Sequence, residues 1–351
     1  MTHLWVRAEH RDNEKRVGLT PKGAASLVQN GFKVTVEKSI SRILPIDGYV
    51  KAGCEIAKEN SWPCAPNDAI IFGLKELPKE TTPLNHRHIM FGHAYKGQYA
   101  GLSLLKRFKS GGGTLYDIEY LTDGIGERVA AFGYWAGYAG AAVSLMVWLS
   151  QKKNRKCHPV QDYIDKASLV NELKKELKMS STEVPNSIVI GALGRVGSGA
   201  SDLCQTLGMK VTKWDIEETK SRGTFHKILD HDIFLNCILA GKDTPVFLSK
   251  KDIKKSRKLS VIGDIACDPD SDYNPIPIYD APTNWIEPSI NISNKPPLSI
   301  MAIDNLPSLL PKESSIDFAS QLLPCLKELD NLNKGVWHRA EKIFKDNIIG
   351  V

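Results

Sequence analysis

Residues 187–199 read SIVIGALGRVGSG, and this stretch decides the fold. The β-branched run Ser187–Ile190 is typical of a buried strand, and it leads through a glycine-rich turn into a helical pattern. Glycine leaves room where the backbone approaches a pyrophosphate, and the first N–H groups of a helix can bind anions. Because Gly191, Gly194 and Gly197 depart from the strict G-x-G-x-x-G spacing, the turn alone is weak evidence, and a tight connection without a ligand is the alternative.

The residues that follow add an acid where a dinucleotide needs one. The run Lys210–Trp214 reads as a second strand, and Asp215 ends it about 20 residues after the turn. A carboxylate at this place accepts hydrogen bonds from the adenosine ribose and repels a 2′-phosphate. Strand, glycines, helix and acid in this order therefore predict a dinucleotide site that uses NAD rather than NADP.

An alternation of short apolar runs and helical patterns extends over the whole chain. The strand candidates are residues 4–7, 33–37, 69–72, 89–91, 114–116, 187–190, 210–213, 232–238, 260–262 and 299–303. Helices are expected from Pro21, with Thr20 as the N-cap, over residues 166–178 and 198–207, and in the tail after Pro311. This pattern predicts an α/β fold of two Rossmann-like domains with mostly parallel sheets and an interdomain cleft.

Composition argues against several classes of protein. Hydrophobic residues make up 42% of the chain and charged residues 25%, which is enough to bury a core. The net charge of +6 is spread along the sequence, which argues against nucleic-acid binding and suits anionic small molecules. Seven cysteines without a C-x-x-C motif argue against a disulfide framework or a zinc ribbon. The N-terminus is charged within a few residues and does not resemble a signal peptide, so a cytoplasmic location is expected.

One stretch imitates a membrane span. Residues 130–149 carry no charge, have about the length that a bilayer helix needs, and place Gly133 and Gly137 at the G-x-x-x-G spacing. The alternative is a buried helix whose small residues allow close packing. We favour the buried helix, because the stretch is single and both flanks read as α/β sequence.

Polar side chains follow two of the predicted strands in the first third of the chain. Lys75 comes just after one apolar run, and His93 comes just after another. Because the carboxyl ends of parallel strands line the ligand crevice, both are candidate functional residues, although a lone lysine at a strand end is more often a surface residue. His86, His88 and His93 could also suggest a metal site, but no cysteine or carboxylate nearby in sequence supports one, so no metal is expected.

Several motifs resemble those of one enzyme family. They are residues 7–9 (RAE), 16–21 (RVGLTP), 73–76 (GLKE), 93–96 (HAYK), 113–117 (GTLYD), 128–133 (RVAAFG), 191–200 (GALGRVGSGA), 213–216 (KWDI) and 303–311 (IDNLPSLLP). Over nearly its whole length the chain resembles the NAD-linked, lysine-forming saccharopine dehydrogenases, and its first motifs also resemble the related alanine dehydrogenases. The resemblance implies a substrate-binding domain of residues 1–132 plus 320–351. It also implies an NAD-binding domain of residues 133–319, which includes the linking helix near 133–150.

The resemblance further implies an activity and a set of site residues. The activity is a reversible, NAD-dependent oxidative cleavage of saccharopine to L-lysine and 2-oxoglutarate, the last step of the α-aminoadipate pathway of lysine biosynthesis. The implied acid–base pair is Lys75 and His93, tuned by Glu76 and Glu119. The positions implied to bind substrate are Arg11, Arg16, Arg128, Phe132 and Asp304. The positions implied to bind NAD are Gly191, Gly194, Arg195, Gly197, Asp215, Thr219, Ile265, Ala266, Cys267, Ile303, Asp304 and Leu306.

Three positions depart from the family pattern, and none of them removes an implied catalytic group. Val196 stands in place of a cysteine of the glycine turn, so Cys237 lacks the disulfide partner that the fungal enzymes have. Glu127 stands where a second arginine is usual, and Arg11 stands where a lysine is usual. An alanine-dehydrogenase-like oxidoreductase and a non-catalytic NAD-binding module stay as alternatives. The expected partners are small molecules, with no nucleic acid and no membrane, and the oligomeric state is open, a monomer included.

Overall fold

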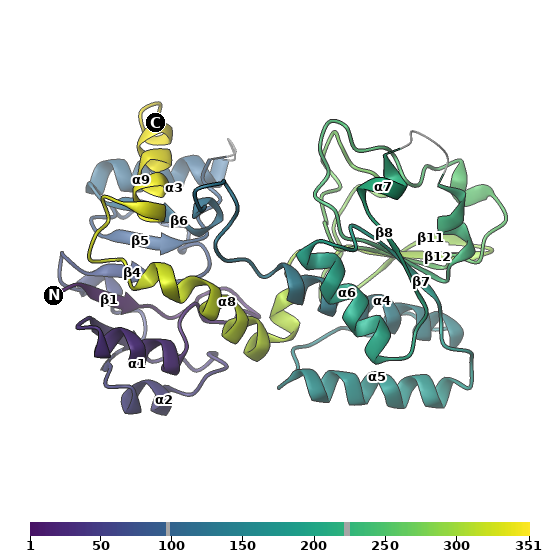
Figure 1. Ribbon diagram of the computed structural model, residues 1–351, viewed down its shortest axis with the longest axis horizontal. Coiled ribbons are helices and arrows are strands. Elements are labelled where there is room, and N and C mark those ends of the chain that lie inside the picture. The colour runs from purple at the N-terminus through teal and green to yellow at the C-terminus, as the bar shows by residue number, and fades with distance from the viewer. Residues whose placement is uncertain (96–98, 221–224) are drawn as a thin grey trace. The chain divides into compact units, whose positions relative to one another are not determined.

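The computed structural model describes residues 1–95, 99–220 and 225–351 (Figure 1). The chain forms two compact units: the first comprises Met1–Ala131 and Pro311–Val351, and the second comprises Phe132–Leu310. Each unit is built on a six-stranded sheet with helices against it, so the α/β class and the mostly parallel sheets expected from the sequence are confirmed.

Helix α8 (Pro311–Leu326) carries the chain back into the first unit, earlier than the expected return at residue 320. Its N-terminal half packs there, since Ser315 Oγ accepts a hydrogen bond of 2.9 Å from the backbone N–H of Val17. Phe318 lies against Phe91, with 6.1 Å between the ring centroids. These contacts explain why the whole helix belongs to the first unit.

The first unit has an all-parallel sheet in the order β3-β2-β1-β4-β5-β6. The strands are β1 (His3–Val6), β2 (Lys33–Glu37), β3 (Glu55–Ala57), β4 (Ile70–Phe72), β5 (Arg87–Met90) and β6 (Thr114–Asp117). The helices are α1 (Pro21–Gln29), α2 (Ile46–Lys51), α3 (Tyr99–Gly111), α8 and α9 (Gly335–Ile348), with 3-10 turns η1 (Trp62–Cys64) and η2 (Ile118–Tyr120). The strand order reverses between β1 and β4, and sheets of this kind bind ligands at the carboxyl ends of the strands near that point.

The second unit repeats this plan in the order β11-β12-β10-β9-β7-β8. The strands are β7 (Ser187–Ile190), β8 (Val211–Trp214), β9 (Ile233–Asn236), β10 (Val261–Asp264), β11 (Ile290–Asn294) and β12 (Pro297–Met301). The helices are α4 (Gly133–Lys152), α5 (Lys166–Ser180), α6 (Arg195–Thr206) and α7 (Ile216–Thr219), with 3-10 turns η3 (His226–Asp230), η4 (Asp252–Lys254) and η5 (Leu306–Leu309). β11 pairs antiparallel with β12, and the other neighbouring strands pair in parallel. The reversal of strand order falls between β7 and β9, beside the glycine turn.

The uncharged stretch of residues 130–149 forms most of helix α4, and nearly all of its residues from Gly137 onward are buried. Its glycines allow a close approach of α6: a Cβ at Gly137 would lie 1.8 Å from Val196 O, and one at Gly199 would lie 1.9 Å from Tyr134 O. Within the described residues, none of the helices combines the length and apolarity that crossing a membrane requires.

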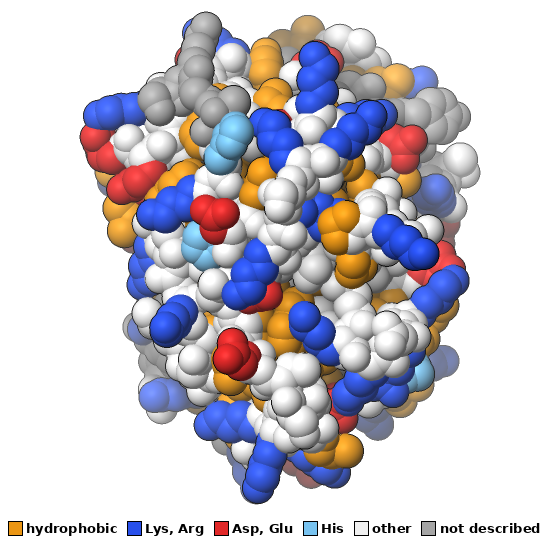
Figure 2. All heavy atoms as spheres, turned by 90° about the vertical axis from the view of Figure 1, so that its right-hand side faces the viewer, with side chains coloured by type: hydrophobic (Ala, Val, Ile, Leu, Met, Phe, Trp, Pro, Cys, Tyr) orange, Lys and Arg blue, Asp and Glu red, His pale blue; other side chains and the backbone are white. Residues whose placement is uncertain are grey.

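Basic side chains are scattered rather than gathered on the face drawn in Figure 2, where Lys and Arg lie among acidic, apolar and other side chains. This distribution agrees with the spread of positive charge along the sequence. All seven cysteines lie in the described part of the chain, and each is a free thiol.

Acid is expected to destabilise the first unit through His88, a histidine of β5 that is 1% exposed. Within the described residues, neither ring nitrogen of His88 has a hydrogen-bond partner. Burial and the nearby charge of Arg7 hold the pKa of His88 well below its ordinary value of 6.5. As the pH falls below about 6.5, the unfolded chain therefore binds a proton that the folded chain does not, and stability falls by up to about 1.4 kcal/mol per pH unit.

Thermal unfolding at pH 7.5 and pH 5 measures this effect. We expect His88→Phe, which removes the titrating group from a site beside Trp62 and Phe108, to weaken the loss of Tm on acidification. His158→Gln at an exposed position is the matched control and should leave that loss unchanged. An equal acid sensitivity in the wild type and in His88→Phe would contradict the assignment.

Candidate active site

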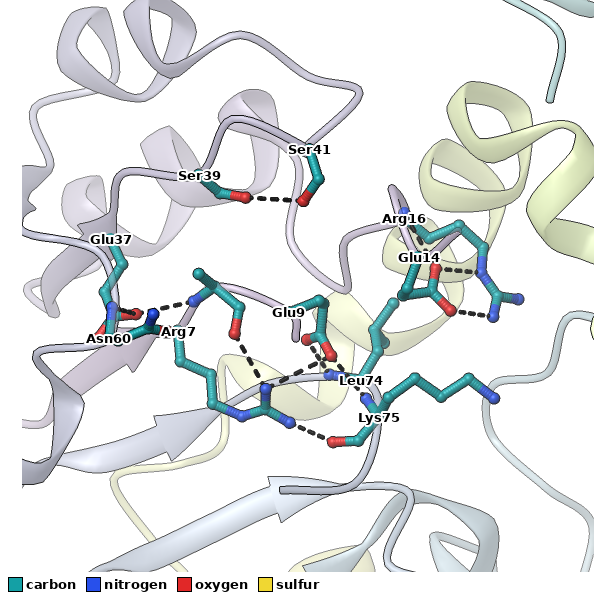
Figure 3. A network of polar contacts seen from close by, with 11 residues as sticks. Arg7, Glu9, Glu14, Arg16, Glu37, Ser39, Ser41, Asn60, Leu74 and Lys75 are labelled. Atoms are coloured by element: carbon teal, nitrogen blue, oxygen red, sulfur yellow. Dashed lines mark hydrogen bonds and ion pairs between the residues drawn. The ribbon is translucent and has the colours of Figure 1, made fainter. Parts of the chain in front are cut away.

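Lys75 lies just beyond β4, at the carboxyl edge of the first sheet, beside a buried ion pair (Figure 3). In this pair, Arg16 donates from Nε to Glu14 Oε1 at 2.8 Å and from Nη2 to Glu14 Oε2 at 2.6 Å. Burial and the positive charge of Arg16 lower the pKa of Lys75, while the carboxylate of Glu14 acts in the opposite direction. The neutral amine, which is the form that can accept a proton, is therefore easier to reach here than in an exposed lysine.

His93 lies between two carboxylates beyond β5. Its Nε2 is 3.4 Å from Glu76 Oε1, and its Nδ1 is 3.5 Å from Glu119 Oε2. The contact with the Glu119 carboxylate raises the pKa of His93, burial opposes this, and the negative charge of Glu76 adds to the rise. His93 adopts a φ of 46°, a left-handed conformation that is uncommon for a non-glycine residue and is often seen at functional sites.

Glu119 also binds Arg128, so one carboxylate contacts both His93 and an arginine. Arg128 Nη2 lies 2.6 Å from Glu119 Oε1, and Arg128 Nε donates to the Glu119 backbone carbonyl at 3.1 Å. The Arg128 side chain is 44% exposed, so part of it faces solvent. A carboxylate ligand could therefore approach Arg128 while Glu119 fixes its orientation.

Asp117, at the end of β6, is an acid of this site that the sequence analysis missed. It is 1% exposed, and its Oδ1 accepts a hydrogen bond of 3.0 Å from the Glu119 backbone N–H. Burial raises the pKa of Asp117 to about 6, and the backbone N–H groups of Glu119 and Gly92 limit the rise. Its position at a strand end was a usable signal, because Lys75 and His93 were found by the same criterion.

A pocket of about 520 Å³ adjoins His93 within the first unit. Its walls are the loop after β4, the start of the loop after β5, and helix α3, and it includes Glu76, Leu77, Gly92, Leu104 and Arg107. Aliphatic side chains and charged groups of both signs therefore surround this space. Sequence reasoning missed this pocket because α3, one of its walls, was not expected.

The glycine turn of the second unit fits a dinucleotide. Gly191 has a φ of +83°, and a Cβ at Gly197 would lie 2.1 Å from Gly191 O, so both positions require glycine. Gly194 is the N-cap of α6, and the nearest described heavy atom to a Cβ built there would be Gly191 O at 3.5 Å. This leaves open space at the helix N-terminus, where a pyrophosphate would accept hydrogen bonds from backbone N–H groups.

Asp215 ties the end of β8 to this turn. Its Oδ2 accepts a hydrogen bond of 2.9 Å from the Leu193 backbone N–H, and its Oδ1 accepts one of 2.9 Å from the Ile216 N–H. Thr219 Oγ1 donates to the Asp215 carbonyl at 2.8 Å. Leu193 and Ile216, the residues whose N–H groups bind this carboxylate, are 83% and 72% exposed, so each presents an apolar side chain to solvent. Such a surface suits the rings of an adenosine beside the ribose.

The first unit has an acid in the equivalent place, Glu37 at the end of β2, but its carboxylate is already saturated. Glu37 is 0% exposed and accepts hydrogen bonds from Trp5 Nε1 and from the backbone N–H groups of Ala8, Asn60 and Trp62. No ribose could bond to a carboxylate filled in this way. Of the two similar sheets, the second therefore fits the dinucleotide.

Comparison with known proteins gives the family. A family model described as alanine dehydrogenase/PNT, N-terminal domain, matches residues 5–139. Saccharopine dehydrogenase (NAD(+), L-lysine-forming) of Schizosaccharomyces pombe is 41% identical over 358 residues, covering 98% of this chain and 97% of that protein. The chain belongs to this saccharopine dehydrogenase family. The protein of the same name from Yarrowia lipolytica is 42% identical over 365 residues, covering 99% of this chain and 98% of that protein.

Solved structures show the same fold at lower identity. An L-alanine dehydrogenase has a TM-score of 0.68 at 15% identity, with 99% of this chain and 94% of that chain covered. A transhydrogenase from Sinorhizobium meliloti has a TM-score of 0.62 at 16% identity, with 94% of this chain and 95% of that chain covered. The fold of this saccharopine dehydrogenase family member is thus shared with both.

The family positions fall into two groups in the structure. The first unit brings Lys75, Glu76, His93, Glu119 and Arg128 together at one edge of its sheet, with Arg16 beside Lys75 and Arg11 at an exposed position before it. The second unit holds Phe132, which is the N-cap of α4, the glycine turn, and the remaining positions Ile265, Ala266, Cys267, Ile303, Asp304 and Leu306. Lys96, the last residue of the HAYK motif, lies outside the described residues.

The histidines and the departures from the family pattern can also be placed. His86 Nε2 lies 3.1 Å from Ala65 O and His88 is in the core, so neither joins His93. No cluster of three or more metal-ligating side chains was found in the described ranges. Cys237 is buried and Glu127 is exposed.

Proposed function

We propose that this saccharopine dehydrogenase family member oxidatively cleaves saccharopine to L-lysine and 2-oxoglutarate, with NAD as the hydride acceptor. The observation that carries the proposal is the pair Lys75 and His93, whose pKa values are shifted in opposite directions at one sheet edge. Groups with environments that move their pKa values toward neutrality are suited to acid–base chemistry. A place at the end of the α-aminoadipate pathway and a cytoplasmic location belong to the same proposal, and cell fractionation tests the location.

The chemistry gives each of these groups a task. Saccharopine is a secondary amine that joins a lysine to a glutarate unit, and it carries three carboxylates. Bound NAD would supply the acceptor for the hydride that leaves the carbon beside the nitrogen. The nitrogen must be neutral for this, so Lys75 accepts its proton. Water then adds to the carbon–nitrogen double bond, and His93 takes and returns the protons that this addition and the release of lysine require.

The residues proposed to bind saccharopine and NAD come from both units. In the first unit, Arg11, Arg16 and Arg128 hold substrate carboxylates, and Glu76 and Glu119 tune the acid–base pair. Phe132 and Asp304, in the second unit, are the remaining substrate-binding positions that the family resemblance implies. NAD is held by the glycine turn with Gly191, Gly194, Arg195 and Gly197, by Asp215 and Thr219, and by Ile265, Ala266, Cys267, Ile303, Asp304 and Leu306.

One assay tests the proposal against its alternatives. The formation of NADH is followed at matched concentrations of saccharopine and L-alanine, with NAD as the acceptor. We expect turnover with saccharopine and little with alanine. Turnover with alanine alone would favour an alanine-dehydrogenase-like oxidoreductase, and NADH binding without any turnover would favour a non-catalytic module.

Cofactor preference is a separate prediction that depends on Asp215. Its carboxylate would accept hydrogen bonds from the ribose hydroxyls and repel a 2′-phosphate, so kcat/KM should favour NAD over NADP. Hydrogen bonds to charged groups contribute about 1.5–3 kcal/mol. Asp215→Ala should therefore raise KM for NAD by about 10–100-fold, with a smaller effect on kcat.

Asp215→Asn is the matched variant, because it removes the charge and keeps the shape. This variant should have a smaller ratio of kcat/KM with NAD to kcat/KM with NADP than the wild type. A wild-type enzyme whose kcat/KM is higher with NADP would refute the assignment of Asp215.

A further inference from the structure

The peptide unit of Lys75 is held by side chains from the segment that follows β1 (Figure 3). Glu9 Oε1 accepts a hydrogen bond of 2.7 Å from the Leu74 backbone N–H, and Glu9 Oε2 accepts one of 2.9 Å from the Lys75 N–H. The Glu9 side chain is 9% exposed. A single carboxylate thus fixes two successive N–H groups at the start of the loop that carries the amine.

Arg7 holds the same loop from the other side. Its side chain is fully buried, and its Nη2 donates to the backbone carbonyl of Lys75. Its Nη1 donates to Ala8 O at 3.0 Å and lies 3.4 Å from Glu9 Oε2. A Cβ at Gly73 would be 2.3 Å from Arg7 Nε. The guanidinium of Arg7 therefore lies where the side chain of any residue other than glycine at position 73 would have to be.

The backbone hydrogen bonds of the sheet end just before Lys75. On the β1 side, Arg7 N donates to Phe72 O at 2.9 Å, and on the β5 side, Gly73 N donates to Ile89 O at 3.0 Å and Phe91 N donates to Leu74 O at 2.9 Å. The N–H and the carbonyl of Lys75 are bound instead by Glu9 and Arg7. Burying two ions has a desolvation cost, and apolar side chains often replace such a pair without loss of stability. The contacts of Arg7 and Glu9 are directed at the backbone of Lys75, which points to a role in placing that residue.

The placement matters because the electrostatics of the Lys75 amine depend on where it lies. Four charged groups influence the amine: Arg11, Glu14 and Arg16 from the segment after β1, and Glu76 from its own loop. The charge of Lys75 is in turn felt by His93, from the loop after β5. In Figure 3 the Lys75 side chain extends away from Arg7 and Glu9, on the side where Glu14 and Arg16 lie.

We propose that Glu9, oriented by Arg7, is a positioning residue that holds Lys75 where it accepts the substrate proton. This inference rests on the proposed function, in which Lys75 is the base. Glu9 makes no contact with the reacting atoms in this scheme and acts through the backbone of residues 74 and 75. The effect of changing it should therefore depend on whether residue 75 is a lysine.

Glu9→Gln is the primary test, because glutamine keeps the shape but presents one NH2 group to a backbone N–H that needs an acceptor. A displacement of about 1 Å in a catalytic group can cost about 10²-fold in rate, so we expect kcat to fall by about that factor. KM for NADH, measured in the reverse reaction, should not change. Moving the amine away from Arg16 and toward solvent would raise the pKa of Lys75, so the rising limb of the kcat–pH profile should shift to higher pH.

A double-mutant cycle separates positioning from stability. In the Lys75→Met background, Glu9→Gln should cause no further loss of the residual activity, because there is no amine to misplace. Glu55→Gln, at an exposed acid of β3, is the matched control and should leave kcat and the pH profile unchanged. If Glu9→Gln fails to fold, Glu9→Asp takes its place, since it keeps the charge for Arg7 but is too short to reach both N–H groups.

Two results would overturn the inference. One is a wild-type kcat and pH profile in Glu9→Gln. The other is an equal fractional loss with lysine and with methionine at position 75, which is the result of a purely structural role. Failure of the proposed function looks different: the wild-type enzyme would not turn over saccharopine, or Lys75→Met alone would have the wild-type rate.

Discussion

Lys75→Met should lower kcat for saccharopine oxidation by about 10²–10⁴-fold, the usual contribution of a general acid–base group. Methionine keeps the length of the side chain but cannot accept a proton. The buried setting that lowers the pKa of Lys75 should accept this apolar side chain, so the protein should fold and bind NADH. Stopped-flow or steady-state assays give the rate, and fluorescence titration with NADH gives the affinity.

His93→Gln should reduce kcat by a similar factor, about 10²–10⁴-fold, because glutamine cannot cycle between two protonation states. Lys75 and His93 act on one substrate, so the double variant should lose less than the product of the single losses. Each single variant should also lose the limb of the pH profile that belongs to the missing group. The limb assigned to Lys75 rises as the pH passes its lowered pKa, since the amine must be neutral to work.

Lys58→Met, at an exposed lysine of the same unit, is the control and should behave as the wild type. If Lys75→Met and His93→Gln both kept wild-type rates and pH profiles, neither residue would be a catalytic acid or base. Glu119, which contacts His93, and Lys96 of the HAYK motif would then be the first residues to test.

The parts of the fold that the sequence predicted well are those with a strong local pattern. Thr20 Oγ1 accepts a hydrogen bond of 3.1 Å from Gly23 N, so the expected N-cap is confirmed, and Pro21 is the first residue of α1. The apolar runs became strands because burial on a parallel sheet requires continuous hydrophobic residues. The glycine turn was recognisable because Gly191 and Gly197 are positions that no larger residue can fill.

The parts that were missed depend on partners far away in the chain. β3 has three residues and is stabilised by pairing with β2, and β11 is stabilised by antiparallel pairing with β12, so neither has a local signal. Helix α6 begins at Arg195 rather than at residue 198, because the turn passes directly into it at Gly194. Tertiary pairing and packing, rather than propensity, set these elements.

The candidate site shows the same division. Lys75 and His93 could be found from their places after apolar runs, since carboxyl ends of parallel strands meet at one edge. The contacts of Glu9 with Leu74 and Lys75 join residues more than 60 positions apart, and nothing in the sequence specifies them. Arg16 was expected to bind substrate, but only the structure shows that two of its nitrogens bind Glu14.

Arg16→Ala should therefore destabilise the protein as well as weaken substrate binding. Arg16 is 3% exposed and Glu14 is 1% exposed, so the substitution leaves a carboxylate buried without its cation. Breaking a buried ion pair in this way costs about 3–5 kcal/mol of unfolding free energy. In the wild type, burial alone would raise the pKa of Glu14, but the charge and hydrogen bonds of Arg16 keep it below its ordinary value. The pKa of Glu14 should therefore rise in Arg16→Ala.

Arg128→Ala is the matched variant that separates binding from stability. The Arg128 side chain is 44% exposed and that of Glu119 is 15% exposed, so this pair is less buried than Glu14–Arg16, and urea unfolding should change less than in Arg16→Ala. Both substitutions remove a charge-assisted contact with a substrate carboxylate, which should cost about 1.5–3 kcal/mol in the affinity for saccharopine and 2-oxoglutarate but not for NAD.

The variant Arg16→Ala combined with Glu14→Gln tests the cause of the instability. Removing the charge of Glu14 should restore part of the stability lost in Arg16→Ala, because the unpaired carboxylate is the source of the loss. It should not restore substrate affinity, which needs the guanidinium. If Arg16→Ala were as stable as Arg128→Ala, the Glu14–Arg16 pair would not be a buried ion pair in solution, and if NAD affinity fell in either variant, these arginines would not be substrate residues.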